Sequence, residues 1–147
     1  MIYVLDHYYS IDHQESCLIV ESNYELDEVI EIYSAIEFLL EEEIDECACL
    51  DDVILLQILE SFYGFINRKP DVPKDVLNGF NLPIGSIYKK IGLYDDNGDQ
   101  ESYIIDLYEA RESCCGKKYK KIMKKWLPIG ARRDDMMAIL RMNEVVE

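Results

Sequence analysis

The chain has 147 residues, of which 49% are apolar, and a formal net charge of −15 at pH 7. This length fits one domain, and the apolar content can bury enough surface to offset chain entropy, which argues against a disordered acidic tail. The net charge repels nucleic acids and anionic membranes and attracts basic proteins.

The charge is distributed unevenly along the chain. Residues 1–67 contain 17 Asp and Glu residues and no Lys or Arg, whereas residues 68–147 contain 13 acidic and all 15 basic residues. We therefore expect a single domain, 1–147, with a strongly acidic half at 1–67 and a nearly neutral half at 74–147. The asymmetry indicates a function based on surface charge.

The sequence favours a cytoplasmic protein that does not enter membranes. The segment 1–9, MIYVLDHYY, has neither a basic region nor an unbroken apolar stretch, so no signal peptide is predicted. The longest apolar segment, 53–66, is interrupted by polar residues and is too short to span a bilayer. Five cysteines, an odd number, fit reduced thiols in a cytoplasm.

In the acidic half, the pattern predicts two strands followed by two helices. Residues 2–9 and 16–21 are rich in β-branched and aromatic types, and a polar turn between them favours a hairpin. Asn23 is then the expected N-cap of a helix at 25–44 with helical apolar periodicity. Asp51 caps a second helix to about Ile66, which is so apolar that we expect it at the centre of the core.

The second half repeats this order. Strands are predicted at 87–94 and 102–108 on either side of Asn97-Gly98, a tight-turn sequence, and helices at 117–127 and 134–142. The fold class is therefore α+β, ββαα–ββαα, packed as one compact domain. Gln-Glu-Ser occurs at 14–16 and again at 100–102. This favours a diverged internal duplication, although short strands after polar turns resemble one another without common origin.

No pattern in the chain supports a catalytic, metal or cofactor site, so none is predicted. His7 and His13 flank the first turn without an evident nucleophile. Two pairs of thiols, at 47/49 and 114/115, have poor spacing for zinc, and the sequence DDNGD at 95–99 lacks the register of a calcium loop.

One face of the helix at 25–46 is the main candidate for binding a partner. At 100° per residue its carboxylates form a contiguous arc, with Phe38 in the middle. A large aromatic side chain among carboxylates is typical of an interface anchor, although Phe38 could instead pack against the C-terminal half. The predicted partner-binding residues are Asp27, Glu28, Glu31, Phe38, Glu41, Glu42, Asp45 and Glu46.

The helix at 117–127 has the opposite charge. Apolar residues line one side, and lysines fill the other. These lysines could neutralise the acidic half of the same chain or of a second protomer in a homodimer, or they could form a second contact surface. Direct nucleic-acid binding is opposed by the net charge, so it is not expected. The lysines concerned are Lys117, Lys120, Lys121, Lys124 and Lys125.

These features predict a small acidic protein without enzymatic activity, of the inhibitor or immunity type. Its acidic helix face would imitate nucleic-acid charge and bind the basic channel of a nuclease toxin, a restriction enzyme or a CRISPR effector. The alternative is a helical adaptor that binds a partner in an apolar groove beside the helix at 51–66. A salt-sensitive interaction would favour the first function, and salt indifference the second.

Overall fold

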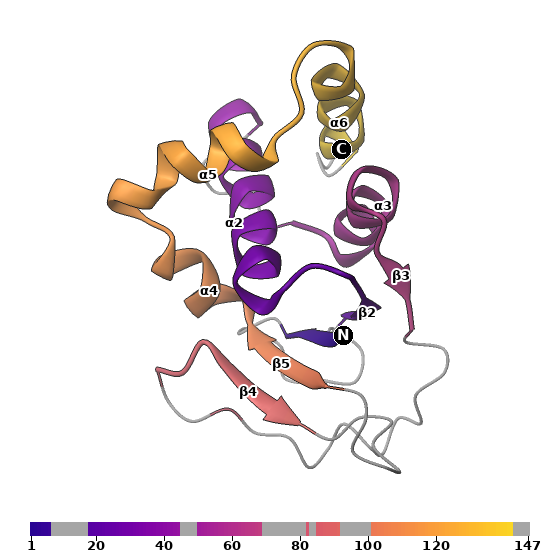
Figure 1. The fold of residues 1–147 in the computed structure, drawn as a ribbon. Helices are drawn as coiled ribbons and strands as arrows, with labels where there is room; N and C mark the ends of the chain where they lie inside the picture. The colour runs from indigo at the N-terminus through magenta and orange to yellow at the C-terminus, as the bar shows by residue number, and fades with distance from the viewer. Residues whose placement is uncertain (7–17, 45–49, 69–81, 83–84, 92–100, 143–147) are drawn as a thin grey trace.

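A computed structural model describes residues 1–6, 18–44, 50–68, 82, 85–91 and 101–142. Within them the chain forms a mixed sheet with helices gathered on one side of it (Figure 1). The elements in chain order are β1 Ile2–Asp6, β2 Leu18–Glu21, α2 Leu26–Glu43, α3 Asp52–Tyr63, β3 Ile66–Asn67, β4 Tyr88–Ile91, β5 Ser102–Asp106, α4 Leu107–Ser113, the short 3₁₀ helix η3 Gly116–Lys118, α5 Tyr119–Trp126 and α6 Ala131–Arg141. The predicted α+β class is confirmed.

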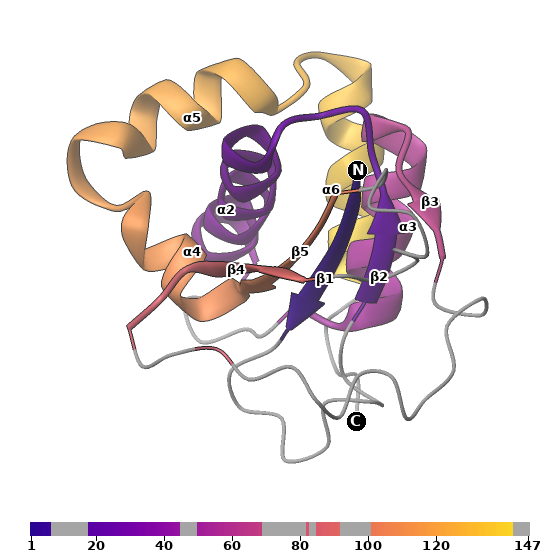
Figure 2. The same ribbon diagram turned by 60° about the horizontal axis from the view of Figure 1, so that its bottom comes forward.

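The sheet joins the two halves of the sequence. Its strand order is β3-β2-β1-β5-β4, and both predicted strand pairs are antiparallel neighbours, β1 with β2 and β4 with β5 (Figure 2). The two pairs meet through β1 and β5, which run parallel with Ile2 opposite Ser102. The turns predicted for the two hairpins lie outside the described residues.

Both faces of β1 are buried, as its nearly continuous apolar sequence requires. Tyr3 and Leu5 face the main core beneath the helices, while Ile2 and Val4 join a smaller cluster on the opposite face. The two faces alternate because successive side chains of a strand point in opposite directions. β1 is therefore an interior strand.

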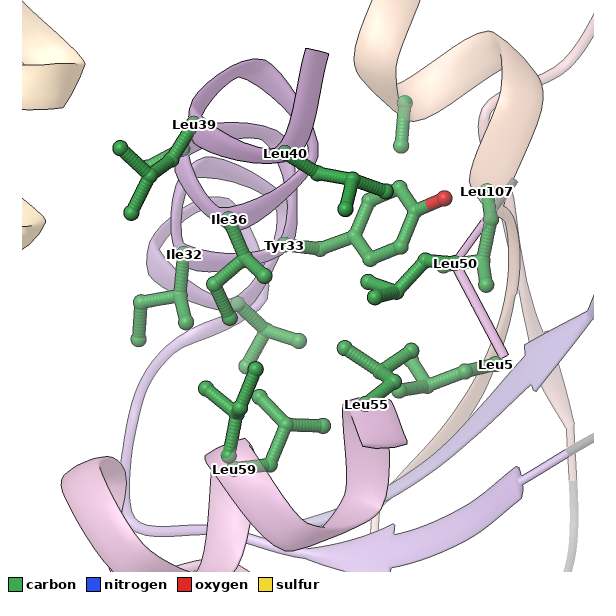
Figure 3. Close-up of a cluster of buried hydrophobic side chains, with 14 of the residues drawn as sticks. Leu5, Ile32, Tyr33, Ile36, Leu39, Leu40, Leu50, Leu55, Leu59 and Leu107 are labelled. Atoms are coloured by element: carbon green, nitrogen blue, oxygen red, sulfur yellow. The ribbon is translucent and has the colours of Figure 1, made fainter. Parts of the chain in front are cut away.

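Helix α2 is the centre of the fold. Every residue from Val29 to Leu40 is buried except Glu31, so both the predicted apolar stripe and most of the opposite face are covered. Its N-cap is Glu25, which forms a capping box with Glu28; the prediction of Asn23 was wrong by two positions. In Figure 3, Tyr33 of α2 points toward Leu50 and Leu107.

Helix α3 lies at the side of the core, which corrects the prediction that it would be central. It begins after the predicted cap, Asp51, whose carboxylate accepts hydrogen bonds from the backbone N–H groups of Val53 and Ile54. It ends at Gly64, which adopts a left-handed conformation with φ of 72°. The side chain of Val53 is 72% exposed, so one flank of α3 has no cover among the described residues.

The second half departs from the predicted repeat. The strand ends at Asp106, whose carboxylate accepts a hydrogen bond from the Glu109 N–H and starts α4, a helix that the sequence analysis missed. The internal duplication is not confirmed. The two central strands, β1 and β5, are the first strand of one pair and the second strand of the other, so no two-fold axis through the middle of the sheet relates the pairs.

None of the helices in the described part of the chain is long and apolar enough to cross a membrane.

Candidate functional site

The predicted aromatic anchor of the acidic face does not reach solvent. Phe38 is only 4% exposed, and its ring packs on that of Tyr119, with 4.9 Å between the centroids. The prediction that Phe38 is an exposed anchor was therefore wrong, and the alternative, packing against the C-terminal half, describes the structure. The cause is that α5 lies beside α2 and covers the side that a surface helix would leave open (Figure 2).

Glu31, in the first half of α2, also meets the C-terminal half. Its carboxylate accepts a hydrogen bond of 2.8 Å from the indole Nε1 of Trp126, and the ammonium group of Lys125 lies 3.7 Å away. The side chains of Glu31 and Lys125 are 32% and 53% exposed, so solvent screens their ion pair. Glu31 thus connects α5 to α2, and its carboxylate is engaged by contacts within the protein.

Arg111 of α4 connects two carboxylates on the next turns of α2. Its guanidinium lies 4.0 Å from Glu37 and forms a closer ion pair with Glu41, while the hydroxyl of Tyr33 donates to Glu37 over 3.2 Å. Burial raises the pKa of the Glu41 carboxyl, although the charge of Arg111 opposes that shift. Among the described residues, the buried Nε of Arg111 has no hydrogen-bond partner, so the hydrogen-bonding capacity of this guanidinium is not fully used there.

Sequence analysis did not identify Arg111, Glu37 or Tyr119 as parts of this arrangement. One feature could have indicated an ionic link: the acidic half contains no Lys or Arg, so a carboxylate buried there can pair with a Lys or Arg only after residue 67. Which cation it finds depends on the packing of α4 and α5, which the sequence alone does not give.

The C-terminal end of α2 presents the exposed part of the predicted face. Three carboxylates, Glu41, Glu42 and Glu43, occupy its last turn, which has no basic residue. Glu43 lies 3.7 Å from Arg133 of α6, and Glu42 is exposed. The predicted residues Asp45 and Glu46 follow directly but lie outside the described residues.

At the other end of α2, the predicted residues have a structural role. Asp27 and Glu28 lie in the first turn, where the helix dipole favours negative charge. The Glu28 carboxylate accepts a hydrogen bond of 3.1 Å from the backbone N–H of Glu25. Helix capping accounts for Glu28, and Asp27 is exposed beside it.

On α5, the described lysines are exposed, and one of them, Lys125, reaches Glu31 of α2. Lys120, Lys121 and Lys124 are exposed, while Ile122 on the opposite side is buried. Lys125 is the one lysine of this helix that forms an ion pair within the described part of the chain. Lys125 therefore neutralises a carboxylate within the protein, whereas the other described lysines of α5 face solvent. The structure does not describe the side chain of Lys117.

Most of the histidines and cysteines considered for catalysis or metal binding are not described by the structure. His7, His13, Cys47 and Cys49 lie outside the described residues, and no group of three or more potential metal ligands occurs among those that are described. Cys114 is buried, and burial raises the pKa of the exposed Cys115 thiol, which lowers its thiolate fraction.

Helix α6 packs against α3, beside which an apolar groove was predicted. The apolar side of α3, with Leu55 and Leu59, belongs to the same core as Met136, Met137 and Leu140 of α6. An adaptor that binds a partner helix along this side would first have to displace α6.

Comparison with models of protein families, with curated proteins and with solved structures finds no match to this chain.

Proposed function

We propose that this protein is a small non-enzymatic inhibitor or immunity-type protein that binds a basic surface of a nucleic-acid-processing enzyme. The C-terminal end of α2 is its contact surface, with Glu42 exposed and with Asp45 and Glu46 following in the sequence. The partner is a nuclease toxin, a restriction enzyme or a CRISPR effector, whose Lys- and Arg-lined channel would take these carboxylates in place of phosphates.

The position of the acids on the helix supports this proposal most directly. A helix carries partial negative charge at its C-terminus, where each carboxylate costs about 0.3–1 kcal/mol when exposed. Helix α2 places three there, without a basic residue in that turn. Ion pairs with Arg111 and Arg133 account for Glu41 and Glu43, whereas folding stability does not explain Glu42 and attraction of a cationic partner does.

The buried position of Phe38 changes the expected character of the interface. Without an aromatic anchor, binding depends on charge at long range and on hydrogen bonds to carboxylates at contact. Such an interface weakens as salt is added, because exposed charges are screened over about 10 Å at 0.1 M ionic strength.

The test uses two variants that remove the same charge. Glu42→Gln/Asp45→Asn/Glu46→Gln changes the proposed surface, and Glu60→Gln/Glu112→Gln/Asp135→Asn changes exposed acids on α3, α4 and α6. Wild-type protein serves as bait to identify the partner in its native source, and titration calorimetry with the purified partner then compares affinities at low and moderate salt.

We expect the first variant to bind at least about tenfold more weakly, since losing exposed partners of close charge pairs costs more than about 1.4 kcal/mol in total. The control variant should stay within about threefold of wild type. Equal losses in both variants would indicate a general field effect, and unchanged affinity in the first would exclude this end of α2 as the contact surface.

A further inference from the structure

Residues 113–133 reverse the charge pattern of the first half. They contain eight Lys and Arg residues and no Asp or Glu, in a chain with a net charge of −15. This segment forms η3, α5 and the beginning of α6, on the outside of α2 (Figure 2). A concentrated positive surface on an acidic protein calls for a physical explanation.

Packing against α2 explains only the apolar side of α5. Ile122 is buried, and Tyr119 and Trp126 pack against the main core. The carbonyl oxygen of Trp126 accepts a 2.8 Å hydrogen bond from the hydroxyl of Tyr63, and its indole donates to Glu31. These contacts orient the helix so that Lys120, Lys121 and Lys124 are exposed.

Stability of the helix explains the lysines only in part: Lys124 and Lys125 lie in the last turn of α5, where the helix dipole favours positive charge, but Lys120 and Lys121 do not. Lys120 and Lys124, like Lys121 and Lys125, are four residues apart, and like charges at this spacing destabilise a helix by about 0.2–0.5 kcal/mol per pair. The first turn of α5 has no acidic residue, although the helix dipole favours one there. Lys125 has an acidic neighbour, Glu31, and the remaining described lysines of α5 have none within ion-pair distance among the residues that the structure describes.

We propose that the lysine face of α5, formed by Lys120, Lys121, Lys124 and Lys125, binds the phosphate backbone of nucleic acid without sequence preference. Two parallel rows of ammonium groups match a polymer with closely spaced negative charges. Lysines act as point charges and do not make the bidentate contacts by which arginine reads bases. The neighbouring rings of Tyr119 and Trp126 face the core, so they are not available for base stacking.

An anionic membrane fits this surface less well. An interfacial helix inserts its apolar face among the lipids, and the apolar face of α5 is already occupied by α2. The net charge of −15 repels any polyanion at long range, but at 0.1 M salt this repulsion is screened beyond about 10 Å, whereas lysine and phosphate interact at contact. The proposed surface is separate from the end of α2, so it does not depend on the function proposed above.

The experiment is fluorescence anisotropy of the full chain with labelled oligonucleotides at low and rising salt. The probes are a single-stranded oligothymidine, a single strand of mixed sequence and a duplex. Lys120→Gln/Lys121→Gln/Lys124→Gln removes the proposed contacts, and Lys89→Gln/Lys90→Gln/Arg141→Gln removes the same charge from exposed positions on β4 and α6. Lys120→Arg/Lys121→Arg/Lys124→Arg retains the charge.

For wild type we expect similar affinity for both single strands, and a slope of log affinity against log salt of about −2 to −3, which corresponds to three or four neutralised phosphates. The glutamine variant should lose at least about tenfold at low salt and approach zero slope, while the arginine variant and the charge-matched control stay within about threefold. Thermal unfolding should show the glutamine variant as stable as wild type or more so, because like-charge pairs are removed.

Three results would overturn the proposal. The first is the absence of wild-type binding at low salt, and the second is an equal loss in the charge-matched control. The third is preference for another anion: binding to phosphatidylserine-containing vesicles but not to oligonucleotides, or lysine-dependent self-association in sedimentation without oligonucleotide binding.

Discussion

The environment of Phe38 distinguishes two interpretations of the acidic helix, in which this residue is either an interface anchor or part of the core. Its ring is buried between α2 and α5, in contact with Tyr119. An interface anchor would be exposed in the free protein and would contribute to binding more than to folding. A core residue would contribute to folding in the absence of any partner.

Replacing Phe38 with alanine should therefore destabilise the isolated protein. Buried Phe→Ala substitutions cost about 3–5 kcal/mol because apolar contacts are lost and a cavity remains. Urea unfolding followed by circular dichroism measures this change, with Gln57→Ala on the exposed flank of α3 as the control. A cost for Phe38→Ala as small as that of the control would show that the ring is not buried in solution.

Glu41 gives the fold a pH dependence that can be assigned to one carboxyl. Burial holds the pKa of Glu41 above its ordinary value despite the neighbouring Arg111. A carboxyl with a raised folded-state pKa binds protons more readily in the folded than in the unfolded protein. Its contribution to stability is thus full below the ordinary pKa, about 4.3, and is lost as the pH rises through the folded-state pKa.

The Glu41→Gln variant should therefore gain stability relative to wild type as the pH is raised from about 4 to about 7. Urea unfolding at several pH values measures the difference, and Glu60→Gln, an exposed substitution, controls for the loss of one charge. If the difference between Glu41→Gln and wild type fell with rising pH, the ion pair with Arg111 would outweigh burial.

At the scale of elements, the sequence predicted the secondary structure of each segment better than it predicted which other segments pack against it. The helix expected at 25–44 is observed at 26–43, and the strands of both predicted pairs are antiparallel neighbours. Hydrophobic periodicity identifies one buried face of α2 but assumes that the opposite face meets water. Helices α4 and α5 cover that face, so Phe38 was misplaced although its helix was correct.

The missed helix, α4, had a local indication in the sequence. Asp106 is followed three residues later by Glu109, and an acidic side chain before a helix with an acid at the third position is typical of an N-terminus. Alternation of apolar residues in 102–108 favoured extending the strand instead. Tertiary context decides between such patterns, because the strand ends where its pairing with β1 ends, at Asp6 and Asp106.

For the candidate site, the sequence identified charges but not their pairing. The arc on α2 contains both carboxylates tied to cations, such as Glu31 and Glu41, and exposed ones, such as Glu42. These groups look alike in a helical projection. Only the positions of Arg111, Lys125 and Arg133 in the folded chain distinguish them.

At the scale of the whole molecule, the two halves of unlike charge share one sheet and one hydrophobic core. β1 lies between β2 of its own half and β5 of the other, and α4 and α5 complete the cover of α2. Cations of the second half also supply the counter-charges of Glu31, Glu41 and Glu43. The acidic half therefore depends on the other half for a strand neighbour, for core packing and for charge.

A fragment of residues 1–67 should consequently fail to fold alone. It would expose the β5 edge of β1 and the outer face of α2, and it would carry 17 Asp and Glu residues without one Lys or Arg. Unpaired backbone groups, lost burial and self-repulsion would all destabilise the folded fragment. Domains of this size have only a small free energy of unfolding, so these losses should prevent folding. Circular dichroism during heating should show no cooperative transition for the fragment. Mixing it with residues 68–147 should restore one, because the separated strands can pair again; a cooperative transition in the fragment alone would instead make the halves independent folding units.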